Sequence, residues 1–289
     1  MNYSTSDNRK VKVLVTVKSP PYPSKSYKEL VCTAGITSDG EWIRLVPIPY
    51  RYLGQDKKFK KFDWIELPVR KHLKDPRLES YAPLDFDNIA IVGSLDKSQR
   101  RAFLEPLVNS NLCKKIRLFK QKSQENQQYE AESLFLIKPY QITGFVIEDE
   151  DPKWKPEWQQ LFEQEPLFED MRLKPLTKIP FSFSYRFLCS PKCNGHKLKI
   201  EDWEIYELAR KYKDNSDLLK QKVRDKYENK IPNSSDIYFF IGSTFQFHRR
   251  KSKNPYIIIG VFYPLKKVSL PLFDKRIDKQ CPSTRRSRK

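Results

Sequence analysis

The 289-residue sequence has no uninterrupted apolar run of the roughly 18 residues that a membrane helix needs. Its first ten residues also contain no apolar signal core. We therefore expect a cytoplasmic protein with no membrane partner. Glycine is scarce, with 8 residues against 18 Phe and 15 Tyr, which argues against a long disordered polymer. The aromatic content supplies apolar material for the cores of two ordinary domains.

Several catalytic motifs are also missing. The sequence has no GxxxxGK[ST] phosphate-binding loop, no GxGxxG dinucleotide motif and no GxSxG nucleophile elbow. ATP-driven and dinucleotide-dependent enzymes are therefore not expected. None of the three histidines is followed two residues later by Glu, which excludes the metal motif of a zinc nucleobase deaminase.

Acidic residues are fewer than basic residues. The 55 Lys and Arg residues outnumber the 36 Asp and Glu residues, which leaves a net charge of +19. Nucleic acid is the usual polyanion that neutralises such a surplus, although a generally basic proteome or a solubility device would also explain it. Charge supports affinity and not sequence recognition, and it does not separate DNA from RNA, because both share the phosphate charge.

Cysteine and histidine are rare but clustered. Cys189, Cys193 and His196 fall within eight residues of a chain that has only five cysteines and three histidines. The turn between them contains Pro and Gly and can aim all three side chains at one zinc ion. We expect His248 as the fourth ligand of a structural zinc site. The other candidates are Cys32, Cys113, Cys281 and Asp202.

Two further considerations bear on these cysteines. Their odd number fits a reducing compartment better than a disulfide framework. The alternative to a metal site is that Cys189 is an ordinary buried thiol and His196 a surface residue.

The hydrophobic pattern predicts an α+β fold. Strand-like runs at 11–17, 30–36, 42–46, 64–69 and 89–92 are separated by frequent turns, which favours a barrel-like N-terminal module. Residues 37–40 read as a hairpin turn. One helix is expected over 97–122, and a return to strand over 133–147.

The C-terminal half is expected to contain the Cys/His turn, helices over 201–212 and 216–228, and a hairpin of strands 237–247 and 256–263. We place the module boundaries at 1–150 for the β-rich module and 151–180 for a linker or packing segment. The C-terminal module then covers 181–274, and a flexible basic tail covers 275–289.

Two groups of residues are expected to contact nucleic acid. The tip of the C-terminal hairpin carries Arg249, Arg250, Lys251 and Lys253, which have no core to fill there. In the N-terminal module, cations alternate with aromatic rings that suit base stacking, although alternation in a strand would equally place the rings in a core. The residues of this second group are Arg51, Tyr52, Lys60 and Lys61.

We expect a nucleic-acid-binding protein with a structural zinc site and no intrinsic reaction. One alternative is a nuclease that uses Mg²⁺ and the carboxylates of Asp202, Glu204 and Asp236. However, Asp202 and Glu204 stand at the start of an expected helix, where the helix dipole favours acids without any catalytic role. The other alternative is a basic interaction subunit of a protein or ribonucleoprotein assembly.

Overall fold

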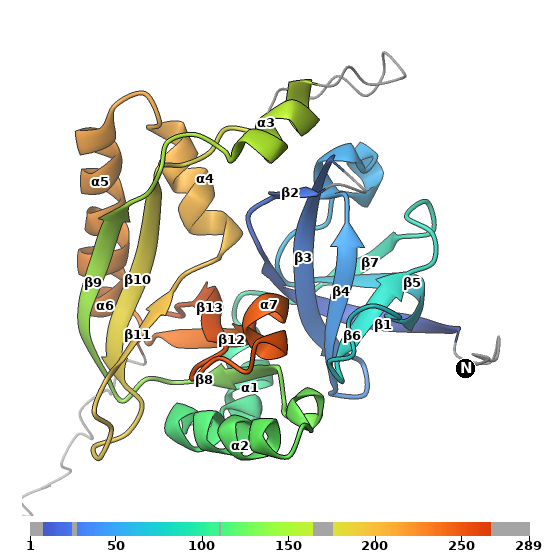
Figure 1. Cartoon of the computed structure of the whole chain (residues 1–289), viewed down its shortest axis with the longest axis horizontal. Helices are drawn as coiled ribbons and strands as arrows, with labels where there is room; N and C mark the ends of the chain where they lie inside the picture. The colour runs from blue at the N-terminus through green and yellow to red at the C-terminus, as the bar shows by residue number, and fades with distance from the viewer. Residues whose placement is uncertain (1–7, 25–27, 110, 164–175, 267–289) are drawn as a thin grey trace, which may run out of the picture.

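The computed structural model describes residues 8–24, 28–109, 111–163 and 176–266 (Figure 1). The basic tail expected at 275–289 lies outside the described residues, as do residues 164–175 of the linker or packing segment expected at 151–180. Helices and strands are mixed in an α+β arrangement, as the sequence predicts.

The N-terminal half forms a closed five-stranded barrel. Five strands follow one another around it in the order β1, β3, β4, β6, β5, and pairing of β5 with β1 closes the circle. All neighbours are antiparallel except β4 and β6. Small strands flank the barrel, β2 on β3 and β7 on β5. Their bounds are β1 Arg9–Lys18, β2 Tyr22–Ser24, β3 Lys28–Thr37, β4 Trp42–Ile48, β5 Asp63–Lys71, β6 Ser80–Pro83 and β7 Ala90–Ser94.

Alternation along the strands explains the barrel interior. In β5, Ile65, Leu67 and Val69 are fully buried, while the residues between them are partly exposed. The turn expected at 37–40 joins β3 to β4. Gly40 has φ +84°, a left-handed conformation that other residues adopt at a cost.

The helix expected over 97–122 is two helices. α1 (Arg100–Leu104) runs into the 3₁₀ turn η4 (Glu105–Leu107), and α2 (Leu112–Gln124) starts afresh. Pro106 has no N–H to continue an α-helix. Asn111 then caps α2, because its side chain accepts a hydrogen bond of 2.9 Å from the Lys114 N–H.

Two three-stranded sheets build the other half. β9 (Gln141–Asp149) and β11 (His196–Lys199) flank β10 (Phe181–Leu188), whereas β8 (Leu134–Ile137) and β13 (Tyr256–Phe262) flank β12 (Tyr238–Ser243). All these pairs are antiparallel. Residues 134–149, which the sequence analysis places in the first module, therefore hydrogen-bond to strands of the C-terminal half.

Helices pack beside these sheets (Figure 1). The strand expected over 237–247 ends at Ser243, because the Thr244 side chain accepts a hydrogen bond from the Phe247 N–H and begins helix α7. The expected hairpin thus exists as β12 and β13, with a short helix inserted at its tip. The helical elements are α3 Pro156–Glu163, α4 Trp203–Lys211, α5 Ser216–Arg224, the π-helical turn η7 Asp225–Lys230, α6 Ile231–Ser234, α7 Phe245–Arg249 and the 3₁₀ turn η5 Gln128–Glu130.

The two halves share a core and a buried ion pair. Leu14 and Val17 of the barrel pack in one cluster with Leu136, Tyr238 and other residues of β8, β12 and β13. Lys61, after the barrel strand β4, lies 3.0 Å from the carboxylate of the α4 cap residue Asp202. Among the described residues, no helix is long and apolar enough to cross a membrane.

Candidate metal centre and basic face

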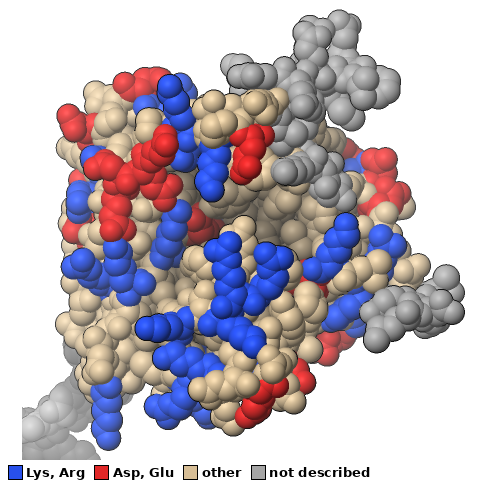
Figure 2. Space-filling view, in the orientation of Figure 1, with Lys and Arg blue, Asp and Glu red and all other residues tan. Residues whose placement is uncertain are grey.

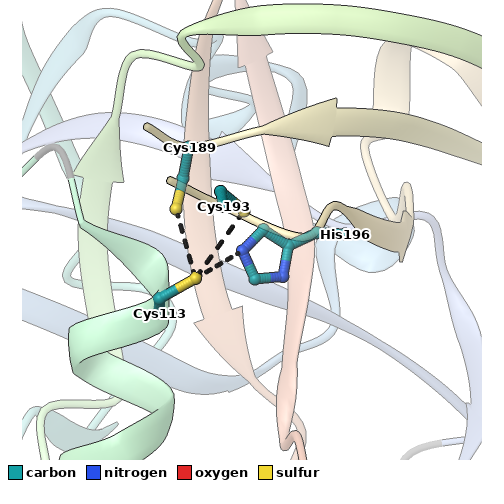
Figure 3. A group of neighbouring side chains, drawn as sticks. All are labelled: Cys113, Cys189, Cys193 and His196. Atoms are coloured by element: carbon teal, nitrogen blue, oxygen red, sulfur yellow. Dashed lines mark hydrogen bonds between the residues drawn. The ribbon is translucent and has the colours of Figure 1, made fainter. Parts of the chain in front are cut away.

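Four metal-binding side chains converge on one point in the C-terminal half (Figure 3). Cys113 comes from the first turn of α2, Cys189 follows β10, Cys193 lies in the turn after it, and His196 begins β11. The Cys113 sulfur lies 3.6 Å from that of Cys189, 3.7 Å from that of Cys193 and 3.3 Å from His196 Nε2. All four ligand atoms lie within 4.8 Å of one another.

Hydrogen bonds within the turn hold Cys193 in place. The Cys193 N–H donates to the Ser190 carbonyl at 3.1 Å, and the Gly195 N–H donates to the Cys193 sulfur at 3.3 Å. Gly195 has φ +98°, so glycine is the residue that reaches this position without strain. His196 then enters β11 opposite Phe187. The local sequence therefore presents three ligands before any contact with α2.

Burial and close contact shift the pKa values of this group. Burial and contact with the neighbouring thiols raise the pKa of Cys113 to about 12. Burial would also raise the pKa of Cys193, but hydrogen bonds from backbone N–H groups outweigh it and lower that pKa. Burial lowers the pKa of His196, which keeps the imidazole neutral, the form that ligates metals. Thiolates this close repel one another, so a cation among them is needed to ionise all three.

The dimensions also fit a metal ion. Zinc–sulfur bonds of about 2.3 Å at tetrahedral angles place two sulfurs roughly 3.8 Å apart. The separations from Cys113 to the other two sulfurs are 3.6 and 3.7 Å. The group can therefore hold a metal ion with little rearrangement.

His248 is not part of this group, which corrects the expected fourth ligand. It lies on α7 and is fully buried, with Nδ1 2.9 Å from the Ser243 hydroxyl and Nε2 2.5 Å from the Gln128 carbonyl. A neutral ring satisfies both contacts when Nε2–H donates and Nδ1 accepts. The ring also packs against Phe119 of α2 and Tyr129. His248 thus attaches α7 to α2 and η5.

Of the other fourth-ligand candidates, Cys113 is the one that the fold brings to the turn. It is 76 residues from Cys189 in sequence, and only the packing of α2 brings the two thiols together. Cys32 lies in the barrel strand β3, Asp202 caps α4, and Cys281 is outside the described residues. The sequence offered one signal for the fourth ligand: the chain has only five cysteines, so few thiols remain to complete a four-ligand group.

The N-terminal nucleic-acid candidates differ in how accessible they are. Lys61 is buried in its ion pair with Asp202, and Arg51 binds Glu29 at 2.7 Å, so neither is a free surface cation. Tyr52 is half-buried, and Lys60 is exposed. The rings that alternate with these lysines, Phe59 and Phe62, are buried, which agrees with the core explanation of the pattern.

The carboxylates considered for a nuclease have structural partners. Asp202 accepts hydrogen bonds from the N–H groups of Glu204 and Val261 and pairs with Lys61. Glu204 lies 3.6 Å from the same lysine. Asp236 is elsewhere and forms an ion pair of 2.7 Å with Arg101. The structure does not bring the three carboxylates to one point.

Seven exposed cations form what we call the basic face. Arg249, Arg250, Lys251 and Lys253 lie at the end of α7 and just beyond it. The Lys251 ammonium donates to Asn126 Oδ1 at 2.5 Å, which joins this segment to the end of α2. Figure 2 shows Lys and Arg side chains gathered over α7 and α2. The three exposed cations of α2 are Lys114, Arg117 and Lys120.

Comparison with protein families identifies two segments of the chain. Residues 117–278 match the model of a domain of unknown function (DUF8757). The chain belongs to the DUF8757 family. Residues 9–108 match a second model, also a domain of unknown function (DUF8758), which covers the barrel. The DUF8757 segment includes three members of the metal group, whereas Cys113 lies between the two matched segments. A search of curated proteins found no match.

Proposed function

We propose that this protein binds nucleic acid through the basic face, without an intrinsic reaction, and that a zinc ion holds that face in place. The observation that carries the proposal is the set of seven exposed cations on two adjacent elements. None of the ion pairs among the described residues engages them, so no carboxylate in those pairs neutralises their charge. Adjacent unpaired cations attract the phosphates of a nucleic-acid strand.

The metal group supports the choice of zinc. Three sulfur donors and one imidazole form a donor set that suits zinc well, and hard cations such as Mg²⁺ prefer oxygen. All four tetrahedral positions are supplied by the protein, which is typical of structural sites; catalytic zinc keeps one position open for water. We therefore assign the zinc a structural role.

The zinc and the basic face are connected through α2. Cys113 is the second residue of that helix, and the cations Lys114, Arg117 and Lys120 follow it. A metal bound to Cys113 ties the start of α2 to the turn between β10 and β11. Because metal binding free energy becomes folding free energy, the ion fixes the position of the α2 cations relative to those of α7.

Replacing both Arg249 and Arg250 with Ala tests the proposed function. We expect weaker binding to a single-stranded oligonucleotide, because two phosphate contacts are lost. The slope of log K against log salt should fall by about 0.7 to 0.9 for each contact. Fluorescence anisotropy over a salt titration, with DNA and RNA of the same sequence, measures both effects.

The matched control is the double variant Arg70→Ala and Lys230→Ala. It removes the same charge from exposed positions outside the basic face and should change the slope much less. Equal effects of the two double variants would contradict a defined interface. Absence of oligonucleotide binding, with tight binding to an acidic protein, would favour the interaction-subunit alternative.

A further inference from the structure

A cavity of about 530 Å³ opens at the junction of the barrel and the C-terminal half, away from the metal group. Its walls come from the barrel strands β1, β3 and β4 and from β13, α7 and the segment after β11. Figure 2 shows the surface hollowed between the two halves, beside the cations gathered over α7. Its size falls in the range of roughly 300 to 1,000 Å³ that is usual for small-ligand sites.

The cavity walls are mainly apolar. Ile257 and Ile259 of β13 line it, while Ile258 between them points into the core. Aromatic rings also contribute: Tyr22 and Phe247 are 36% and 42% exposed, although large rings usually bury most of their surface. Such walls suit an occupant with flat apolar faces, since exposed rings can stack on them.

A few polar groups complete the lining. The Arg44 guanidinium is buried and donates to oxygens of Ser80 and Ser133. It forms no ion pair with a carboxylate among the described residues. Arg77, in contrast, is paired with Asp75. The lining therefore contains a guanidinium whose direct contacts are hydroxyl and carbonyl oxygens.

Glu201 adds a carboxyl group to the cavity lining. Its carboxyl group accepts a hydrogen bond from the Tyr22 hydroxyl and lies 2.9 Å from the Lys199 ammonium. Burial raises the pKa of Glu201 to about 8, and a hydrogen bond with the Tyr206 side chain opposes that shift. Arg44 offers N–H donors to the cavity, and the Glu201 carboxyl offers an acceptor and, when protonated, also a donor. A neutral group whose edge carries both donors and acceptors suits both, and a nucleobase is such a group.

The short helix α7 contributes residues to both the cavity lining and the basic face. Phe245, Gln246 and Phe247 line the cavity, and Arg249 and Arg250 follow within one helical turn of about 5.4 Å pitch. Phosphates in contact with these arginines would therefore lie close to the cavity lining.

We propose that this cavity receives one nucleobase, turned out of a strand whose phosphates lie on the basic face. The inference rests on the proposed function and adds a base-binding site to it. Taking a base out of its stack costs least in a single strand, so single strands are the expected substrate.

The test compares a short, fully abasic single strand with the same strand that carries one central base. Stacking in a protein site is worth enough to raise affinity about tenfold or more for one base. We expect this gain in the unmodified protein. Ile257→Trp, which fills the cavity, should abolish the gain and leave binding of the abasic strand unchanged. The control Ile91→Trp places the same ring on an exposed position of β7 and should keep the gain.

A second variant covers the case in which Ile257→Trp fails to fold. Glu201→Gln keeps the size of the side chain but alters its donors and acceptors, so the order of affinities among strands with different single bases should change several-fold. An equal gain in all variants, or no gain in the unmodified protein, overturns the base site and leaves the proposed function standing. If no strand binds, abasic or not, the proposed function fails and this inference fails with it.

Discussion

Asp75 and Arg77 form a buried ion pair. Asp75 binds Arg77 through two hydrogen bonds, one of 2.8 Å to the guanidinium Nε and one of 2.5 Å to Nη2. Burial would raise the pKa of Asp75, but the hydrogen bonds and charge of Arg77 outweigh it and lower that pKa to about 2. Arg77 in turn donates to the Ser243 carbonyl, so the pair joins the barrel to the end of β12.

The Asp75 pair predicts a pH dependence of stability. Its folded pKa of about 2 lies below the ordinary value of 3.8, so its stabilisation is present above pH 4 and is lost as the pH falls toward 2. The difference in unfolding free energy between the unmodified protein and Asp75→Asn should therefore shrink by about 2 kcal/mol from pH 5 to pH 2. Urea unfolding at each pH measures it. A difference that stays constant would contradict the ionic role of Asp75.

At the scale of elements, α7 is held by one histidine. The helix has five residues, too few to be stable without tertiary contacts. His248 supplies them through its hydrogen bonds to Ser243 and Gln128 and its packing on Phe119. The four cations at and beyond the end of α7 are therefore positioned by a buried ring beneath them.

His248→Ala separates this anchoring role from the role of a metal ligand. Loss of a buried ring and two hydrogen bonds should lower the free energy of unfolding by about 2 to 4 kcal/mol. Zinc content should stay unchanged, because His248 is outside the metal group. His248→Gln keeps a donor and should lose less stability. Loss of zinc from folded His248→Gln would restore His248 as a ligand.

Sequence patterns predict the helices and strands better than the tertiary contacts between them. Alternation at Ile65, Leu67 and Val69 indicates a strand, and the spacing from Cys189 to His196 indicates a metal-binding turn, because both signals are local. The position of Cys113 depends on how α2 packs against the C-terminal sheets, and no local sequence pattern predicts this packing. His248 was misassigned for the same reason, since a histidine near the end of a strand looks alike as a ligand and as an anchor.

At the scale of the whole molecule, the barrel and the C-terminal half pack against each other. Their shared core, the Lys61–Asp202 pair and the cavity all lie at the junction. The net charge of +19 could be read from composition, but the basic face could not, because it joins α2 and α7, which are distant in sequence. The proposed zinc site at the start of α2 would link the fold to this face.

Binding of one zinc ion by the Cys113, Cys189, Cys193 and His196 group is therefore the central claim that connects the fold to the basic face. Elemental analysis of protein purified without added metal tests it most directly. We expect about one zinc per chain, lost in Cys113→Ser and retained in Cys32→Ser, with weaker oligonucleotide binding after the loss. Folded protein that contains no zinc, or a Cys113→Ser variant that keeps it, would contradict the account.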